Sequence, residues 1–338
     1  MVTLKMIADK CGYSTATVSK ALNDMPDINM DTAQRIRDVA ESMGYMPNAA
    51  ARTLKTSRSK IIGLFMFFTS GTIWTHEYFS RIATSIQNVL ENAGYDIVPI
   101  HSNRENDIGS YREYCRYRGY DGIIVMSAGF DSAQLMDLVT SSIPLVTVDY
   151  AFNNRSAVLS DNEQGMNDLV RYICSQGHRR IAFIHGEDTT VTRVRIASFY
   201  KAIEELGIME SEVYVREGIY NAPECSAKIT EELLNLPLPP TCIIYPDDFS
   251  YIGGMNQIRK QGLKIPADIS VAGYDGILLS EVLQPNLTTI KQDTEGMGYY
   301  AATMLLEAIE KPRTYISRHV TRPSRLLTGG SIADIRGK

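Results

Sequence analysis

The chain has 338 residues, 44% hydrophobic and 22% charged, which is a globular composition with room for two or three domains. Its formal net charge of −5 argues against a chain that binds nucleic acid along its whole length. The charge is uneven, however: residues 1–60 carry nine basic and six acidic side chains, a net charge of +3, against −8 for the remainder. A basic head on an acidic body is typical of a small DNA-binding module carried by a larger domain.

Residues 4–23 have the pattern of a helix, a tight turn and a second helix. Gly12 supplies the positive φ that a four-residue turn requires, and Ser14 is a ready N-cap for the second helix. Val18 and Ala21 place apolar groups inward at helical spacing. The outer face then carries Thr15, Ala16, Thr17 and Lys20 at or near the helix N-terminus. This is how a helix-turn-helix offers side chains to a DNA major groove.

A third helix is predicted over residues 30–43, with Asn29 as its cap and Gly44 as its stop. Three short helices can bury a small shared core, so residues 1–46 are predicted to form an all-α head. A piece of about two turns follows Pro47 and ends in a polar linker, too short to be a stable helix alone in water. We therefore expect residues 47–59 to be a hinge segment that orders only on meeting a partner.

From residue 60 the pattern changes to apolar strands that alternate with helices. Continuous apolar strands with helices between them indicate parallel sheets covered on both faces. One series ends near Asp149 and a second begins near Ala157, so residues 60–332 are predicted to form two α/β lobes with a cleft between them. The expected lobes are residues 60–150 plus 276–312, and residues 151–275 plus 313–332. The predicted strands are 61–68, 95–100, 122–126, 145–149, 157–159, 180–185, 241–245 and 269–274, and the predicted helices are 78–92, 108–118, 132–140, 163–176, 194–206, 223–235, 248–261 and 294–309.

The remaining sequence signals concern compartment and chemistry. The five cysteines are odd in number and form no C-x-x-C pair, so we expect reduced thiols in a reducing cytosol. The N-terminus has no signal-peptide pattern, and the longest apolar run, residues 61–68, is too short to span a bilayer. The five histidines lack metal-ligand spacing, and no catalytic or nucleotide-binding motif is present. We expect a cytoplasmic protein that is not an enzyme, with no metal, no cofactor and no membrane partner.

Several separate motifs, in order along nearly the whole chain, resemble the lactose-repressor/galactose-repressor (LacI/GalR) family. They lie at residues 3–23, 44–54, 177–184, 271–275 and 287–290. The resemblance implies a helix-turn-helix head and a bilobed, periplasmic-binding-protein-like body of two doubly wound parallel sheets. It also implies a ligand-responsive transcription factor that acts as a dimer.

The resemblance assigns roles in DNA binding to the head and the hinge segment. Thr15 and Ala16 can meet thymine methyl groups and Lys20 can reach guanine acceptors, so these three are candidates for base contacts. In the hinge segment, Leu54 matches a leucine that the family wedges into the minor groove, and Ala51 on the same face permits close approach. The candidates for phosphate and hinge contacts are Thr3, Ser14, Thr17, Ser19, Asn23, Asn48 and Arg52.

The resemblance also places an effector cleft between the lobes, where the carboxyl ends of the strands meet. Arg195 matches an arginine that grips the ligand, Asp275 and Asp149 match polar contacts, and Tyr78, Phe79 and Tyr220 match aromatic wall positions. Ser127 and Asp161 are weaker candidates, and Asp161 could instead be a helix cap. Asp247 departs from the family, which usually has an asparagine or serine there. Because a carboxylate only accepts hydrogen bonds, this departure favours a donor-rich ligand such as a sugar.

The sequence is therefore interpreted as a dimeric repressor that binds a pseudo-palindromic, double-stranded operator and senses a small molecule, with a sugar the leading candidate. No leucine-heptad tail follows residue 332, which favours a homodimer over a tetramer. One alternative is a cytoplasmic sugar-binding protein without a DNA function, and the intact head argues against it. Another is an enzyme on a doubly wound scaffold, for which no catalytic constellation is visible.

Overall fold

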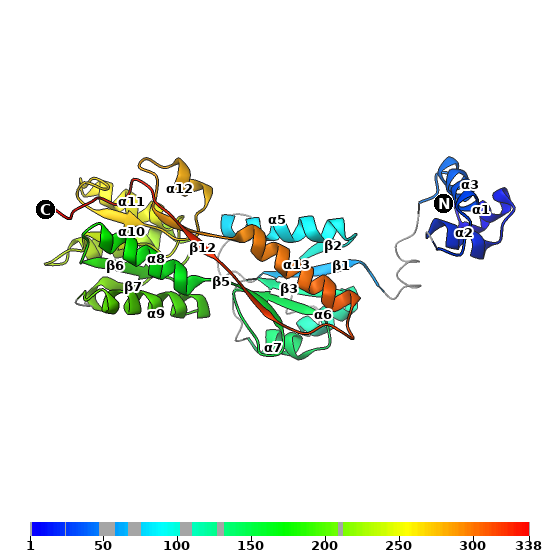
Figure 1. Ribbon diagram of the computed structural model, residues 1–338, viewed down its shortest axis with the longest axis horizontal. Coiled ribbons are helices and arrows are strands. Elements are labelled where there is room, and N and C mark those ends of the chain that lie inside the picture. Colours follow the sequence, from blue (N-terminus) through cyan, green and yellow to red (C-terminus); the bar gives the residue numbers. More distant parts are fainter. Residues whose placement is uncertain are drawn as a thin grey trace. The chain divides into compact units, whose positions relative to one another are not determined.

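The computed structural model describes residues 2–23, 25–46, 58–66, 76–101, 110–126, 132–208 and 212–337. The chain divides between Ser59 and Lys60 into two compact units, which we call the head and the body (Figure 1). Most of the predicted hinge segment, residues 47–57, lies outside the described residues, so its conditional order stays a prediction. No helix of the described part combines the length and the apolar character needed to cross a bilayer.

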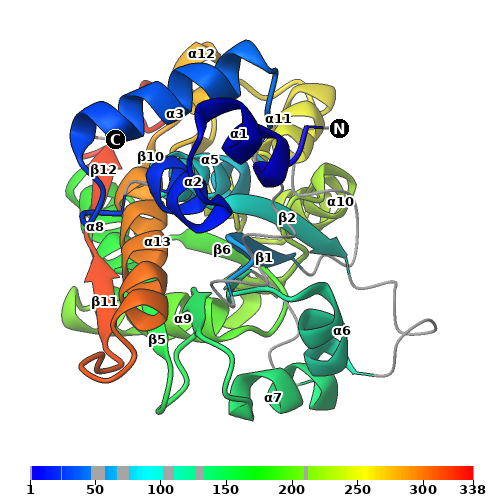
Figure 2. The same cartoon turned by 90° about the vertical axis from the view of Figure 1, so that its right-hand side faces the viewer.

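The head contains the three predicted helices, α1 (Leu4–Cys11), α2 (Thr15–Leu22) and α3 (Met30–Ser42) (Figure 2). Gly12 ends α1 with a φ of 75°, and the Ser14 hydroxyl accepts the Thr17 backbone N–H at 3.1 Å as the cap of α2. One buried cluster joins the three helices. Its members are Ile7, Ala8, Val18, Ala21, Ala33, Ile36 and Ala40.

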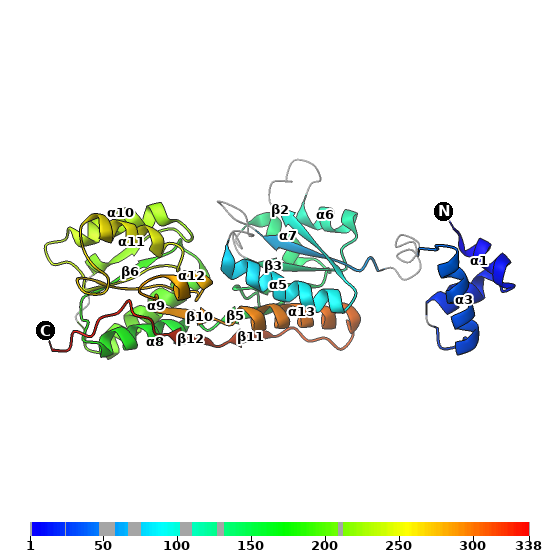
Figure 3. The same ribbon diagram turned by 90° about the horizontal axis from the view of Figure 1, so that it is seen from above.

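The first lobe of the body is built on a parallel six-stranded sheet of order β11-β5-β4-β3-β1-β2. Helices α5 (Glu77–Asn92) and α13 (Thr294–Glu310) cover one face, while α6 (Tyr111–Arg118) and α7 (Ala133–Thr140) cover the other (Figure 3). Both faces are therefore apolar, as the continuous apolar strands predicted. The strands are β1 (Ile61–Met66), β2 (Asp96–His101), β3 (Gly122–Met126), β4 (Leu145–Val148), β5 (Ser156–Ser160) and β11 (His319–Arg322).

The second lobe has a parallel four-stranded sheet of order β7-β6-β8-β9. Helices α8 (Asn162–Ser175) and α9 (Thr190–Glu205) pack on one face, and α10 (Pro223–Leu234) and α11 (Tyr251–Lys260) on the other. An antiparallel pair, β10 (Thr289–Gln292) with β12 (Ser324–Leu327), is bridged to the edge of this sheet next to β9. The remaining elements are β6 (Ile181–His185), β7 (Val215–Glu217), β8 (Cys242–Ile244), β9 (Ser270–Ala272), a 3₁₀ turn at Glu212–Tyr214 and the short helix α12 (Leu278–Val282).

The predicted lobe boundaries are wrong at three places. Strand β5 was expected to open the second lobe, but it pairs with β4 in the sheet of the first lobe. Strand β11 also belongs to that sheet, whereas α12 and β10, which were assigned to the first lobe, lie with the second. The chain crosses between the lobes at residues 160–162, 292–294 and 322–324. An apolar run predicts a strand but carries no information about which neighbour that strand will pair with.

The three crossover segments are hydrogen-bonded to one another. The Asp161 backbone N–H donates to the Arg322 carbonyl at 2.9 Å, and the Arg322 guanidinium donates twice to Asp293 Oδ2, at 2.7 and 2.8 Å. The Ser324 hydroxyl donates to the Asp161 carbonyl at 3.0 Å. The lobes are therefore joined by one connected unit, about which a movement of one lobe against the other would turn.

Truncation of one side chain tests the common core of the head. Ile36 is fully buried, whereas Met30 on the same helix is 85% exposed. We expect Ile36→Ala to lower the free energy of unfolding of the head by about 2–5 kcal/mol, because it leaves a cavity in a small core. Amide hydrogen exchange of the full chain should show faster exchange in α1–α3 and unchanged exchange in the body. Met30→Ala serves as the control, and unchanged exchange in Ile36→Ala would contradict the shared core.

Candidate nucleic-acid interface and ligand cleft

The outer face of α2 presents the predicted base-reading side chains to solvent. Thr15, Ala16 and Lys20 are exposed, while Thr17 and Ser19 are half-buried. None of the three exposed side chains packs in the core of the head, so this face is available to a partner. The Lys20 ammonium is paired with a carboxylate, that of Asp27.

Three of the predicted phosphate contacts also hold the head together. The Ser14 hydroxyl caps α2, and the Thr3 hydroxyl caps α1 by accepting the Met6 backbone N–H at 3.4 Å. The Asn23 side chain donates to the Ser19 carbonyl at 2.5 Å, at the end of α2. The capping roles of Thr3 and Ser14 are compatible with a phosphate contact, because an N-cap residue sits where the helix N–H groups face outward. The predicted hinge contacts Asn48, Ala51, Arg52 and Leu54 lie outside the described residues.

Most of the predicted cleft residues follow the carboxyl ends of parallel strands. Asp149 follows β4, Tyr220 lies in the turn after β7, Asp247 follows β8 and Asp275 follows β9. In open α/β sheets this edge is where ligands bind. Ser127, which follows β3, lies outside the described residues.

In the first lobe, Tyr78 and Asp149 form a polar pair. Tyr78, in the first turn of α5, is 5% exposed, and its hydroxyl donates to Asp149 Oδ2 at 2.8 Å. The other carboxylate oxygen, Oδ1, is buried and has no hydrogen-bond partner among the described residues. Asp149 also has a φ of 64°, in the left-handed region. A buried acceptor without a donor is costly, so this oxygen is a candidate acceptor for a ligand hydroxyl.

In the second lobe, the Arg195 guanidinium is held rigidly. Arg195 lies on α9 and is 4% exposed. Its Nε donates to Asn162 Oδ1 at 2.8 Å and its Nη1 to the Pro246 carbonyl at 3.2 Å. Its plane lies over the Tyr274 ring, 3.5 Å from the centroid, and Nη2 is 3.8 Å from Asp275 Oδ1. A guanidinium fixed in this way keeps donors free in a defined direction.

The two halves of the site influence each other electrostatically. Burial raises the pKa of Asp149 to about 6, although the hydrogen bond from Tyr78 and the charge of Arg195 lower it. Asp275, on the same lobe as Arg195, raises the pKa of Asp149 further. Burial also raises the pKa of Asp275, against the opposing effect of Arg195. The first-lobe carboxylate is therefore close enough to the second-lobe ion pair for the two to interact electrostatically.

The predicted aromatic positions differ in how they are held. The Tyr220 hydroxyl lies 2.8 Å from Thr192 Oγ1, and its ring covers Gly186, where a Cβ atom would come within 2.1 Å of the ring. Only glycine permits that approach. Phe79 is half-buried against the α5–α13 core, with its ring centroid 4.9 Å from that of Tyr78. Tyr220 is thus a fixed wall of the second lobe, whereas Phe79 is partly a core residue.

Asp247 and Asp161 act within the chain, and for Asp247 this corrects the prediction. The Asp247 carboxylate accepts three hydrogen bonds, from the Ser250 N–H and hydroxyl, each at 2.7 Å, and from the Asn221 N–H at 2.8 Å. Its oxygens are largely occupied in holding the turn before α11, so Asp247 gives no support to a donor-rich ligand. Asp161 Oδ1 accepts the Gln164 N–H at 2.9 Å, so Asp161 is a helix cap, the alternative that the sequence had left open.

Three residues that the motifs did not indicate position the predicted ones. Asn162 and Tyr274 hold Arg195, and Gln292 donates to Asp275 Oδ1 at 2.7 Å. The Tyr274 hydroxyl and Gln292 Oε1 are buried and have no partner within the described part of the chain. A polar residue beside a predicted site residue, as Tyr274 is beside Asp275, was the one signal that the sequence offered.

A second contact between the lobes lies at the start of α5. Glu77 Oε1 accepts the Leu278 backbone N–H of α12 at 2.8 Å, and Arg81, one turn along α5, pairs with the same oxygen at 2.5 Å. Ile277, the N-cap residue of α12, has no side-chain capping bond, so Glu77 of the first lobe supplies one. We call this contact the clasp. It lies directly before Tyr78 in the sequence, so the clasp and the cleft share one helical turn.

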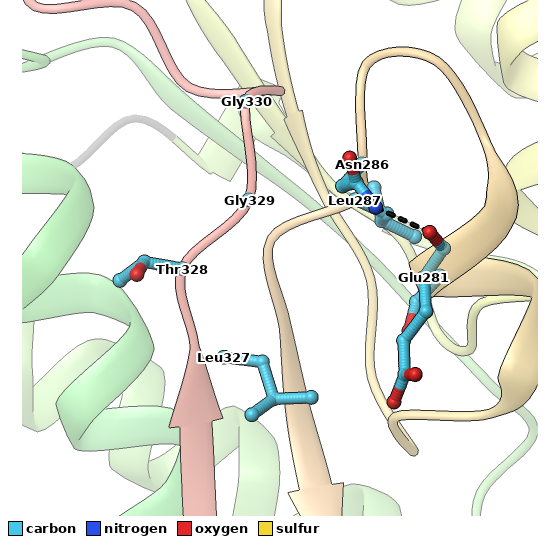
Figure 4. Close-up of a pocket in the computed structure, with 8 residues that line it drawn as sticks. Glu281, Asn286, Leu287, Leu327, Thr328, Gly329 and Gly330 are labelled. Carbon is cyan, nitrogen blue, oxygen red and sulfur yellow. Dashed lines mark hydrogen bonds between the residues drawn. The ribbon is translucent and has the colours of Figure 1, made fainter.

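A separate depression of about 290 Å³ lies on the second lobe, beside the ends of β10 and β12 (Figure 4). None of the predicted site residues lines it. Its donors are used within the chain: the Asn286 side chain donates to the Glu281 carbonyl, and the Gly329 N–H donates to Thr288 Oγ1 at 3.0 Å. These two donors are therefore not available to a ligand. Within the described ranges, no group of three or more histidine, cysteine or acidic side chains could hold a metal ion.

Comparison with known proteins gives two family matches. Residues 3–48 match the bacterial regulatory proteins of the lacI family, and residues 170–332 match a periplasmic binding protein-like domain. The probable HTH-type transcriptional repressor ExuR of Bacillus subtilis (strain 168) is 35% identical over 319 residues, which cover 93% of each chain.

Solved structures share the fold. The Lac repressor dimer bound to operator and the anti-inducer ONPF superimposes with a TM-score of 0.82 at 24% identity, over 98% of this chain and 99% of that one. The complex of the transcriptional regulator CelR with cellobiose superimposes with a TM-score of 0.74 at 22% identity, over 98% of this chain and 100% of that one. The predicted fold class is confirmed.

The buried carboxylate of the cleft predicts a pH dependence. Because the folded pKa of Asp149 is raised from 3.8 to about 6, the folded state holds the extra proton in this window, and stability falls as pH rises through it. We expect Asp149→Asn to raise the free energy of unfolding of the body by about 1–3 kcal/mol at pH 7.5 and to change it little at pH 4. Asparagine also tolerates the positive φ.

Chemical denaturation at pH 4, 5, 6 and 7.5 measures this difference. Asp188→Asn is the control, because Asp188 is exposed and its pKa is lowered by Arg193, so its titration lies below the window. If Asp149→Asn destabilises the body equally at all four pH values, ionisation of the Asp149 carboxylate does not lower the stability of the body.

Proposed function

The chain belongs to the LacI family of bacterial regulatory proteins, and we propose that it is a repressor. We propose further that a sugar bound between the lobes of the body sets its affinity for the operator. As a member of the family it is a ligand-responsive, DNA-binding regulator of transcription. The observation that carries the sugar site is the arrangement of Asp149 on one lobe opposite Arg195 and Asp275 on the other. Only a ligand that reaches both lobes can satisfy both halves.

The chemistry of the cleft suits a polyhydroxylated ligand. Asp149 Oδ1 needs a donor, Arg195 retains donors on Nη2, and a sugar hydroxyl can both donate and accept. The Tyr220 ring offers a flat apolar face, against which the C–H side of a pyranose can pack. The CelR structure contains cellobiose in the same fold, which supports this choice. We propose that the ligand is bound and not chemically changed, in keeping with a relative described as a repressor.

Signal transfer would use the connection between the lobes. A ligand that bridges the cleft favours one relative position of the lobes, and the crossover segments permit that movement. The first lobe begins at Lys60, directly after the head. We propose that its position is transmitted to the three helices of the head through residues 47–59. A difference of about 1–3 kcal/mol between the two states is enough for control. We propose that two chains pair about a dyad, which places two heads on successive half-sites of the operator.

In the head, we propose that Thr15, Ala16 and Lys20 read base edges, while Thr3, Ser14, Thr17, Ser19 and Asn23 contact phosphates. The exposure of the first three and the helix-capping positions of Thr3 and Ser14 support this division. We propose that Asn48, Ala51, Arg52 and Leu54 meet the minor groove at the operator centre. Such contacts make the affinity strongly dependent on salt.

Removal of the head separates the two activities. A chain of residues 60–338 should bind no duplex in a gel shift at low salt, yet it should show the same increase in melting temperature with the same sugars as the full chain. A panel of neutral sugars, sugar phosphates and purines provides the ligands. If the full chain is stabilised by purines alone, the sugar assignment is wrong. If residues 60–338 still bind DNA, the head is not the DNA-binding unit.

The clasp gives a second prediction about ligand binding. Glu77→Ala removes the acceptor for the Leu278 N–H and disfavours the observed arrangement of the lobes. We expect sugar affinity to fall about fivefold, which corresponds to the loss of one partly exposed hydrogen bond. Glu91→Ala is the matched control, because Glu91 lies on the same helix and accepts only a local bond from Gln87 at 2.6 Å. Calorimetric titration measures both variants, and equal affinities would show that the clasp does not contribute.

A further inference from the structure

Lys20, on the proposed DNA-binding surface, is paired with the carboxylate of Asp27. Lys20 lies in the last turn of α2, and its ammonium donates to Asp27 Oδ2 at 2.5 Å, in the segment between α2 and α3. Both side chains are about half exposed, at 48% and 54%. The hydrogen bond from Lys20 lowers the pKa of Asp27, so the carboxylate is ionised at neutral pH. An exposed pair of this kind contributes little to the stability of a fold, so stability does not account for its position.

The carboxylate is unfavourable for general affinity to DNA. Binding to any duplex depends on how many phosphates lysine and arginine side chains neutralise, and a negative charge beside the reading face opposes that attraction. By pairing with Lys20, Asp27 also removes one cation from the set available to phosphates. A head selected only for tight DNA binding would do better without it.

The pairing of Lys20 with Asp27 is favourable for a contact between Lys20 and a base. Lysine carries a compact charge on a flexible stem, with three donors that can turn toward any nearby acceptor. One donor is engaged by Asp27, and two remain, which matches the O6 and N7 acceptors that guanine presents in the major groove. A lysine tethered in this way is held close to α2 and kept from reaching outward to the backbone.

We propose that Asp27 is a specificity-determining residue of the head, which restrains Lys20 for a base contact and withholds it from phosphates. This inference rests on the proposed function of the head as the DNA-binding unit. Its consequence is that Asp27 weakens binding to arbitrary DNA more than binding to the operator. The head then distinguishes the operator both by its contacts to the operator bases and by a lower affinity for all other sequences.

The test uses the full chain and a random duplex library. Wild-type protein selects a duplex from the library, and its affinity for this duplex is compared with its affinity for a shuffled duplex of the same composition, between 50 and 200 mM salt. We expect Asp27→Asn to bind the shuffled duplex about threefold or more tightly, with a salt slope steeper by about one counterion. Affinity for the selected duplex should change less than twofold, so the specificity ratio should fall about threefold.

Two controls separate position from charge. Asp38→Asn, on the exposed side of α3, makes the same change in net charge at a carboxylate that pairs with Gln34 and not with Lys20. It should leave the specificity ratio unchanged. In a Lys20→Met background, Asp27→Asn should no longer alter the ratio, because the restrained group is absent.

Two outcomes would overturn the proposal in different ways. If Asp27→Asn and Asp38→Asn shift the affinities for both duplexes alike, Asp27 acts only as a general negative charge, and the inference fails while operator binding stands. If wild-type protein enriches no duplex from the library, the proposed function of the head fails, and the inference falls with it. Circular dichroism of each variant confirms that the exposed substitutions leave the helices folded.

Discussion

The burial of one positive charge, that of Arg195, organises the ligand-binding half of this molecule. Removing a guanidinium from water is costly, and the chain offsets the cost with the Asn162 oxygen, the Pro246 carbonyl, the face of Tyr274 and the nearby Asp275 carboxylate. These partners come from three segments, at residues 162, 246 and 274–275, which meet at the carboxyl edge of the second-lobe sheet. Once fixed, the same charge acts across the cleft on Asp149. We propose that this cation and the buried Asp149 oxygen, which has no partner among the described residues, together define what the site can bind.

The sequence predicted the head better than the body, because the contacts that define the head join residues close together in the sequence. In the head, Gly12, Ser14 and Asn29 each end or begin a helix through contacts no more than four residues away, and all three act as predicted. In the body, β5 joins the first sheet through β4, and β11 joins it by pairing with β5, between residues 162 positions apart. Apolar runs located the predicted strands but could not assign them to a lobe. The antiparallel pair β10–β12 had no pattern of its own to reveal it.

For the candidate site, the sequence indicated which residues lie there but not what each of them contacts. Motif resemblance placed Tyr78, Asp149, Arg195, Tyr220 and Asp275 at the cleft edge, where the structure brings them near one another. It could not predict that Asp247 is occupied by donors from residues 221 and 250, because that depends on how two loops meet. Nor could it indicate that Glu77 caps a helix of the other lobe, a contact between residues 201 positions apart. A residue positions another only when its side chain points toward it, and a single sequence does not show where side chains point.

The central claim is that occupancy of the cleft changes the affinity of the head for DNA, and one measurement addresses it directly. The dissociation constant for the selected operator is determined with and without a saturating sugar, for wild type and for Arg195→Met. The account predicts a change of about fivefold or more in wild type and none in the variant, with operator affinity in the absence of sugar preserved. A sugar that stabilises the protein but leaves operator affinity unchanged, or an Arg195→Met variant that responds as wild type does, would contradict it.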